Sequence, residues 1–548
     1  MSSGSRWSTI ALVVSCLAIG AALLHANQEQ LEYFFMTDAL YLPSIFKDCV
    51  AEGNSLGDWY LNPSPNFFPD MIAYRLLNAL VGDFRLASYI YPFAQMLVIG
   101  LLLRAIVREN KVARHDLGVA LGLLLFVLPV FSGWWADDFI TSFQLLVNSY
   151  HMGAFVNALL CAWLSLRYLR RFAAWELIAL IAITMLGGAS DKLFWVMFVA
   201  PAMAASALLA FNAPMRRRAL VLLVLLPLVS FISWWALNAI EEALPMMIAE
   251  PCAMLDFEHI GKAWDKFLGL MGWYLGNNRL GAFMIVCALL VLLGSAWAAW
   301  RLARQWRSRI VQAEAEDVLP LAAGIMAFTF MPLVLFAPML NGAFDGADSI
   351  RYNIAAFLFA AFVVGVSIGN RSLIASRFLG VGMLLLVGAP SLWACLQFGD
   401  YERLASFKPK RVATLDSLAS EHGLKHGVAG YWDAKVITLF SEKGLNVLPV
   451  FPQLAVYIHV NREDMFYWTN DGDTLRYDFV MMNKDFNEPQ VGSELPVPYT
   501  KVERDGVVLL LTPPWSHNPA TRIPKPQPVP APVDSTGLGA SPSAPGQR

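Results

Sequence analysis

The sequence predicts a polytopic α-helical membrane protein with about eleven transmembrane helices and a C-terminal extracytoplasmic α/β domain. Hydrophobic residues make up 57% of the 548 residues, and only 15% are charged. Apolar runs long enough to cross a bilayer recur between charged clusters, and from about residue 398 the composition becomes that of a soluble domain. Together these observations exclude a soluble cytoplasmic enzyme.

Eleven apolar runs have the length that a membrane-crossing helix needs, about 20 residues or somewhat fewer. The first could be taken for a signal peptide because it follows Arg6 and ends at the small residue Ala26. We expect it to be retained, since it is long enough to span and its cleavage pattern is poor. The predicted spans are 9–26, 88–106, 117–134, 151–169, 175–189, 193–211, 219–239, 280–300, 318–340, 352–369 and 378–397.

Positive charge is concentrated in alternate connections between these runs. Because cytoplasmic loops are enriched in Lys and Arg, the pattern predicts an inside N-terminus and an outside C-terminus, which requires an odd number of spans. The basic residues of the inner connections are Arg104, Arg108, Lys111 and Arg114; Arg167, Arg170 and Arg171; Arg216, Arg217 and Arg218; Arg301, Arg304, Arg307 and Arg309; and Arg371 with Arg377.

The regions outside the membrane are unequal in size. Residues 1–397 form the predicted transmembrane module, in which the first outer connection, 27–87, carries two predicted surface helices at 41–52 and 70–81. Residues 398–512 are expected to form the soluble α/β domain. Its predicted helices cover 411–424 and 434–443, and its predicted strands 427–431, 446–450, 454–460, 477–482 and 507–511. Residues 513–548 are rich in Pro, Ser and Ala and are predicted to be disordered.

Charge and cysteine content limit the partners and the covalent structure. A net charge of -2 provides no basic stripe, so nucleic acid is excluded as a partner. Cys49 and Cys252 lie in predicted outer connections, and the sequence allows one disulfide between them in an oxidising compartment.

Asp38 is the candidate catalytic carboxylate. It lies about a dozen residues beyond the first span, within the apolar and aromatic stretch 34–41. A carboxylate in such a setting suits a general base. The alternative is structural, because Thr37 or Asp38 could cap the surface helix that follows.

Asp137, Asp138 and His151 are the candidate metal ligands. The two carboxylates lie in the second outer connection between aromatic residues, and His151 begins the next span. Two oxygens and an imidazole can hold a divalent cation such as Mg²⁺ or Mn²⁺. Hydrated loop acids and a histidine bonded to a loop carbonyl explain the same residues.

Three outer cations are candidate phosphate ligands, because outer connections contain few. Arg351 is the strongest candidate, since a guanidinium binds phosphate through two parallel hydrogen bonds. Lys192 and Arg279 are the others. Alternatively, Arg351 offsets Asp345 and Asp348, Lys192 pairs with Asp191, and Arg279 extends towards the membrane surface.

Taken as a whole, the chain resembles the GT-C superfamily of membrane glycosyltransferases, and in particular its bacterial members. The resemblance rests on the inside N-terminus, the Asp near the start of a long first outer loop with two surface helices, the acidic second loop and the soluble outer C-terminal domain. Residues 430–434 (GYWDA) and 446–450 (NVLPV) are similar to the C-terminal domain of bacterial members.

The resemblance implies transfer of a sugar from a polyprenyl-phosphate carrier to an envelope glycan, a lipid or a protein on the outer face of a bacterial inner membrane. Asp38 matches the catalytic acid of the first loop, Asp137 or Asp138 the second-loop acid, and Arg351 a contact to the lipid phosphate. The chain departs from the family in having one acid at Asp38 where many members have two. A single displacement predicts inversion at the anomeric carbon. The alternatives are a transporter or flippase and a non-catalytic assembly subunit with the same fold.

Overall fold

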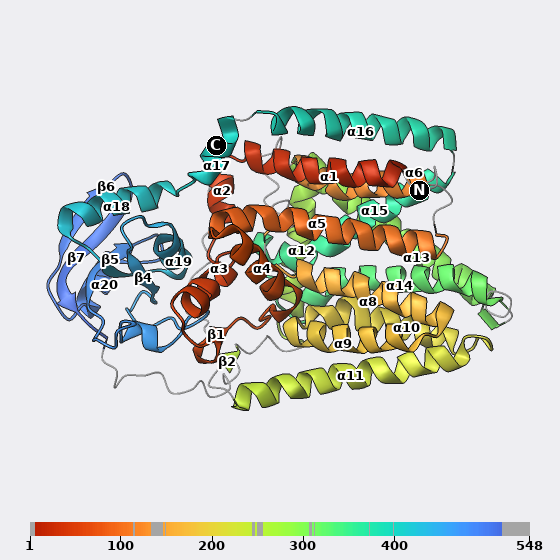
Figure 1. Ribbon diagram of the computed structural model, residues 1–548, viewed down its shortest axis with the longest axis horizontal. Coiled ribbons are helices and arrows are strands. Elements are labelled where there is room, and N and C mark those ends of the chain that lie inside the picture. The colour runs from red at the N-terminus through yellow and green to blue at the C-terminus, as the bar shows by residue number, and fades with distance from the viewer. Residues whose placement is uncertain are drawn as a thin grey trace.

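The protein is described here from a computed structural model. The structure describes residues 6–112, 116–132, 146–147, 150–243, 247–248, 256–305, 310–311, 313–371, 373–397 and 399–517. Figure 1 shows a body of long helices with roughly parallel axes, and an αβ region at one end of it. The αβ region therefore covers one set of helix ends.

A helix occupies each of the eleven predicted apolar ranges. Among the described residues, seven helices are long and apolar enough to cross a membrane, and four further apolar helices are shorter. This is compatible with a membrane protein, and the number of eleven spans stays a prediction. The helices are α1 (Arg6–His25), α5 (Phe84–Glu109), α6 (Asp116–Ser132), α8 (Met152–Arg171), α9 (Ala174–Ser190), η5 (Trp195–Val199) with α10 (Ala200–Leu209), α11 (Arg216–Ala243), α13 (Arg279–Arg304), α14 (Ala315–Leu340), α15 (Ile354–Arg371) and α16 (Leu373–Cys395).

Helices α6 and α15 approach each other most closely through paired glycines. A Cβ atom on Gly365 would lie 2.7 Å from the Cα of Gly122, and one on Gly369 would lie 2.3 Å from the Cα of Gly118. Each helix spaces its two glycines four residues apart, which places them on one face. Small residues at this spacing let two helix backbones come into contact.

The first outer connection folds into several short elements. Helices occupy both ranges predicted for surface helices: α3 (Tyr41–Phe46) with η2 (Lys47–Ala51), and η4 (Phe67–Met71) with α4 (Ile72–Val81). All residues of α3 but one are buried in the protein, and a location at the bilayer surface stays a prediction. Before them comes α2 (Gln28–Phe34), where Asn27 and Gln30 form a reciprocal capping box. Between them lie η3 (Leu56–Asp58) and β1 (Tyr60–Leu61).

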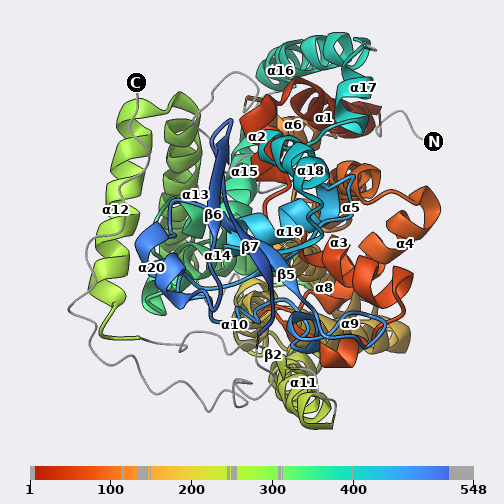
Figure 2. The ribbon, with the colours of Figure 1, turned by 90° about the vertical axis from the view of Figure 1, so that its left-hand side faces the viewer.

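A later connection also contacts this loop. β1 pairs in parallel with β2 (Met247–Ile248), which precedes the amphipathic helix α12 (Ile260–Asn277). Viewed along the long axis of the molecule, α12 lies across the direction of the long helices (Figure 2).

The C-terminal region contains a five-stranded sheet with the order β4-β3-β5-β7-β6. β3 pairs in parallel with β4 and β5, whereas β7 is antiparallel to β5 and β6. The elements are α17 (Gly399–Ala405), α18 (Lys410–His422), β3 (His426–Ala429), α19 (Tyr431–Phe440), β4 (Asn446–Pro449), η8 (Asp464–Phe466), β5 (Tyr477–Met482), α20 (Glu488–Glu494), β6 (Thr500–Arg504) and β7 (Val507–Trp515).

Three details of this region correct the predictions. The predicted strand 454–460 is irregular, because Leu454 and Val460 have positive φ angles of 57° and 53°, and only an isolated bridge forms there, between Val450 and Val456. Strand β6 was not predicted. β7 continues to Trp515, so the segment predicted to begin a disordered tail at 513 is still paired; residues 518–548 lie outside the described part.

The C-terminal region packs against the first outer connection. Phe35 stacks on Phe407 with ring centroids 5.6 Å apart and meets Phe440 edge-on at 5.1 Å. The backbone N–H of Tyr60 donates to the carbonyl of Asn461 at 2.9 Å. Phe35, at the end of α2, is thus held against Phe407 and the last residue of α19, and Tyr60 of β1 is held against Asn461.

Candidate active site

Asp38 lies at the junction of three segments that are far apart in the sequence. Its Oδ1 accepts a hydrogen bond of 2.7 Å from the hydroxyl of Tyr431, the first residue of α19. Its Oδ2 lies 3.1 Å from Nη1 of Arg351, in the short helix η7 (Ala347–Tyr352) that precedes α15. The Asp38 side chain keeps 18% of its surface exposed. The carboxylate is thus held in place and still accessible.

The local geometry rules out the capping alternative for this segment. Leu40 is the N-cap of α3, and no side chain caps that helix. The hydroxyl of Thr37 instead donates to the carbonyl of Tyr431 at 3.0 Å. Both polar side chains of the pair therefore serve the contact with α19.

Arg351 is enclosed by aromatic rings as well as paired with Asp38. Its guanidinium carbon lies 5.4 Å from the ring centroid of Tyr150 and 5.2 Å from that of Tyr352. Burial opposes the charge, but the surrounding tyrosines and Asp38 outweigh it, so the pKa of Arg351 is raised and the guanidinium stays charged. The alternative pairing of Arg351 with Asp345 is wrong, because Asp345 is bound to Lys266.

His151 lies beside this cluster and is engaged by Asp191. Its Nδ1 is 2.6 Å from Asp191 Oδ2, and its ring centroid is 5.0 Å from that of Tyr352. Burial raises the pKa of Asp191, but the charge and hydrogen bond of His151 outweigh it, so the net pKa is lowered. Asp191 also accepts from the hydroxyl of Ser64 at 3.1 Å.

Of the three predicted metal ligands, only His151 lies among the described residues. Asp137 and Asp138 lie outside the described residues. Within the described ranges, no group of three or more His, Cys, Asp or Glu side chains is arranged to hold a metal ion. His151 is bonded to Asp191, which the sequence had suggested as a partner for Lys192. The metal assignment of Asp137, Asp138 and His151 stays a prediction.

The two other predicted phosphate ligands have less defined surroundings. Lys192 is half-buried next to Asp191, and Arg279 is exposed at the first residue of α13. Neither forms a hydrogen bond with Asp38 among the described side chains. The predicted disulfide partner Cys252 also lies outside the described residues.

A second buried carboxylate, Asp70, was not predicted to matter. It is 2% exposed and receives a short hydrogen bond from the hydroxyl of Tyr91. A Cβ on Gly153 would lie 2.1 Å from its Oδ2, so the first turn of α8 must carry a glycine here. Burial, with a smaller effect of the Asp191 charge, raises the pKa of Asp70 to about 6.

Aromatic side chains of the C-terminal region form the wall next to Asp38. The ring of Tyr431 lies 5.1 Å from Tyr457 and 5.9 Å from His459, measured between centroids. Burial lowers the pKa of His459 to about 4, so its imidazole is neutral at pH 7. Burial and the adjacent Asp38 raise the pKa of Tyr431, which keeps its phenol protonated as a donor.

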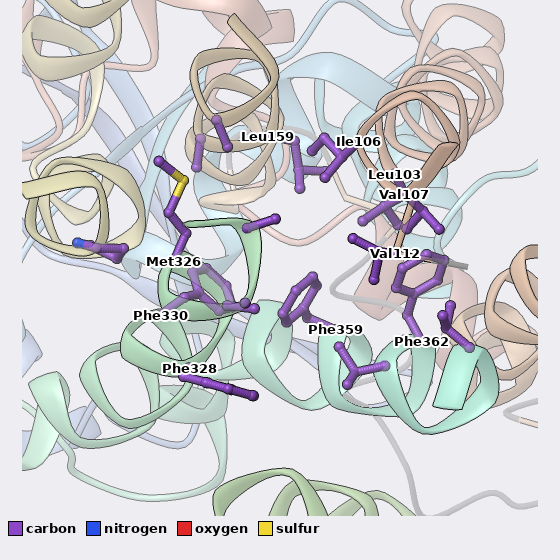
Figure 3. A pocket seen from close by; sticks show the side chains of 18 of the residues that line it. Leu103, Ile106, Val107, Val112, Leu159, Met326, Phe328, Phe330, Phe359 and Phe362 are labelled. Atoms are coloured by element: carbon purple, nitrogen blue, oxygen red, sulfur yellow. The ribbon is translucent and has the colours of Figure 1, made fainter. Parts of the chain in front are cut away.

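An apolar cavity of about 280 Å³ lies among the long helices. Side chains from α5, α8, α14 and α15 line it, and Figure 3 shows Leu103, Phe330, Phe359 and Phe362 facing the space. Phe155, also in its wall, follows His151 by one turn of α8. The cavity thus runs from Val112 and Asn370, at the opposite helix ends, to Phe155, one turn of α8 from His151.

Comparisons with protein-family models and with curated proteins find no match to this chain. The chemistry of the site therefore has to be judged from its own geometry. A carboxylate that can accept a proton, a permanently charged guanidinium beside it and an apolar cavity below suit a substrate with a polar head, an anionic group and a hydrocarbon tail.

Proposed function

We propose that this chain is a glycosyltransferase of the GT-C superfamily that moves a sugar from a polyprenyl-phosphate carrier to an acceptor at the outer face of a bacterial inner membrane. The observation that supports it best is the junction of Asp38, Arg351 and Tyr431. Residues 38, 351 and 431 come from the first loop, the segment before the tenth apolar range and the C-terminal region. The fold brings together groups that a lipid-linked sugar needs in one place.

In the proposed reaction an acceptor hydroxyl attacks the anomeric carbon of the donor. Its oxygen forms a bond to that carbon as the bond from the carbon to the phosphate oxygen breaks. Asp38 takes the hydroxyl proton, and the carrier leaves as polyprenyl phosphate. Because the attack is a single displacement from the opposite side, the sugar is transferred with inversion.

Arg351 would stabilise the negative charge that develops on the departing phosphate. A fixed cation in a partly buried site contributes more to such stabilisation than it would in water. In the structure Arg351 pairs with Asp38, so the phosphate competes with Asp38 for the guanidinium. Tyr431 continues to hold the carboxylate when Arg351 turns to the phosphate.

The apolar cavity is suited to the isoprenoid part of the carrier. Its wall consists largely of Leu, Val, Met and Phe side chains, and it includes Phe155, one turn of α8 after His151. Hydrocarbon bound there would place the phosphate at the level of the helix ends. This arrangement needs no charged group at mid-membrane depth, which transporters commonly have.

We further propose an inside N-terminus and an outside C-terminal region. Exposed tryptophans gather near both ends of the long helices, as in interfacial aromatic belts. At the end carrying the N-terminus of α1 (Figure 1) they accompany the arginine clusters; towards the other end they lie in the C-terminal halves of α11 and α16. The first group is Trp7, Trp175, Trp297 and Trp300, and the second is Trp234, Trp235 and Trp393.

The test is turnover by the purified full-length protein reconstituted in lipid vesicles. Polyprenyl-phosphate sugars with labelled glucose, galactose, mannose or arabinose are supplied together with envelope glycan acceptors. We expect transfer of the label with stoichiometric release of polyprenyl phosphate and inverted anomeric configuration.

Other outcomes would overturn the proposal. Movement of intact labelled lipid between leaflets without cleavage would identify a flippase. Binding of the carrier without cleavage, in a preparation whose folding is verified, would identify a non-catalytic subunit.

A further inference from the structure

A second cavity lies between the first outer connection and the C-terminal region. Its volume is about 430 Å³, which falls in the range of small-molecule binding sites. α3 and η2 form one wall; α19, the edge strand β4 and the segment 461–475 form the other. We call it the interface cleft. The proposed reaction makes no use of it.

Buried charged groups from both walls of the interface cleft form one network. Asp48 is 5% exposed; its Oδ2 accepts from Trp59 Nε1 at 2.7 Å and lies 3.0 Å from Nε of Arg462. Asn54 donates to the other oxygen at 2.9 Å. Burying such groups is costly, so they are retained only where their geometry is well satisfied. The ion pair between Asp48 and Arg462 thus ties the two walls of the cleft together.

Lys435 extends this network from α19. Its ammonium group donates to the carbonyl of Val460 at 2.6 Å and to Asn461 Oδ1 at 3.1 Å, and it lies 5.3 Å from the ring centroid of Trp59. Burial lowers its pKa to about 7, against the attraction of Asp48 and Asp38. Lys435 follows Tyr431, the partner of Asp38, by one turn of α19, so the cleft lies close to the candidate active site.

The charges that line the interface cleft nearly cancel. Three basic side chains face four acidic ones: Lys47, Lys435 and Arg462 against Asp48, Glu52, Asp471 and Asp473. A phosphate or other polyanion would meet the carboxylates, and a polycation would meet the basic groups. The cleft therefore favours an uncharged ligand with many hydrogen-bonding groups.

The remaining lining groups match the surface of a sugar ring. A pyranose presents an apolar C–H face and an edge of hydroxyl groups. Trp468 offers a partly exposed ring of 38% relative exposure, and Asn470 and Asp473 offer planar amide and carboxylate groups next to it. Asn470 also joins the two walls, because it donates to Glu52 at 3.0 Å.

We propose that the interface cleft binds a neutral oligosaccharide, the chain of the glycan acceptor. This inference rests on the proposed function, and it chooses a carbohydrate over a lipid or protein acceptor. The cleft and the candidate active site share α19, with Tyr431 at Asp38 and Lys435 one turn later in the cleft. A glycan held there would have its growing end directed along α19 towards Asp38.

The test is calorimetric titration of the full-length protein in lipid nanodiscs with tetrasaccharides of glucose, galactose, mannose, rhamnose or arabinose and no donor. We expect saturable binding of at least one, with a Kd below about 10 mM. Loss of the stacking surface in Trp468→Ala should weaken this binding about tenfold. Asn470→Ala, at the rim, should weaken it less.

Tyr499→Ala is the control, because it removes an exposed aromatic ring of the same region that does not line the cleft. It should bind as the wild type does. Saturable binding of none of the five neutral tetrasaccharides, binding unchanged by Trp468→Ala, or tighter binding of a uronic acid tetrasaccharide or an extended tetrapeptide would overturn the inference.

Asp38→Asn separates this inference from the proposed function. It should bind the tetrasaccharide normally while losing transfer. Sugar binding by a wild-type protein that never cleaves the donor would contradict the proposed function, whereas transfer without sugar binding at the cleft would contradict the inference.

Discussion

Asp38 and Asp70 are both acidic residues of the first outer connection, and both contact a tyrosine hydroxyl, but their surroundings differ. Asp38 is partly exposed and pairs with the guanidinium of Arg351. Asp70 is almost wholly buried against Tyr91 and the first turn of α8, and burial raises its pKa to about 6. The two carboxylates therefore share a tyrosine contact and differ in their solvent access and in the neighbouring guanidinium, and the proposed function assigns the chemistry to the accessible one.

The largest expected effect is that of Asp38→Asn. The amide can keep the hydrogen bond from Tyr431 but cannot take the acceptor proton, so transfer should fall roughly a thousandfold. Steady-state turnover with labelled donor measures this, and size-exclusion behaviour checks folding. Asp70→Asn is the matched change and should retain activity within about tenfold. Equal losses in both variants would remove the distinction between the two carboxylates.

Arg351→Gln should have the next largest effect. Removing the cation leaves the departing phosphate without its counter-charge, so kcat/KM for the donor should fall about a hundredfold. Arg351→Lys should recover part of the loss, since it restores the positive charge but not the two parallel N–H donors of the guanidinium. Lys266→Gln, at an exposed cation paired with Asp345, serves as the control. An unchanged kcat/KM in Arg351→Gln would contradict the phosphate role.

Gly153→Ala tests the tight packing around Asp70. The new methyl group would collide with the carboxyl group, and overpacking of this kind costs about 2 kcal/mol of unfolding free energy. Thermal unfolding in detergent measures the change. In the double variant with Asp70→Ala the two costs should not add, because the collision is removed. Additive losses would show that the glycine is needed for another reason.

The smallest expected effect is on the pH dependence of stability. Folding raises the pKa of Asp70 from 3.8 to about 6, so the folded state binds the proton more tightly. Its contribution is complete below about pH 4 and is lost as the pH rises through 6. Unfolding curves between pH 4 and 7 should show this decline in the wild type and a smaller one in Asp70→Asn. A rise in stability across that range, attributable to residue 70, would reverse the assignment.

The sequence was sufficient for features that depend on local composition. The long helices lie at the predicted apolar ranges because length and hydropathy decide them within a few residues. The two surface helices of the first connection are also local patterns. The predicted strand 454–460 failed because its apolar residues pack as an irregular segment with left-handed turns at both ends.

The candidate site required long-range contacts that no local pattern carries. Asp38 and Arg351 could be selected from their settings, but the sequence suggested Asp345 and Asp348 as the partners of Arg351. Tyr431 is 393 residues from Asp38 and was quoted only as part of a similar segment, without a role. Asp70 was hidden within a predicted surface helix, and only the fold shows that it faces inwards.

The paired glycines of α6 and α15 constrain how a lipid can enter. Because their backbones touch at Gly122 with Gly365 and at Gly118 with Gly369, these helices cannot slide or separate without losing both contacts. α15 also forms part of the wall of the apolar cavity and continues directly from the segment carrying Arg351. A carrier in this cavity would therefore have to enter between the other lining elements, α5, α8, η5 with α10, and α14, while α15 stays packed against α6.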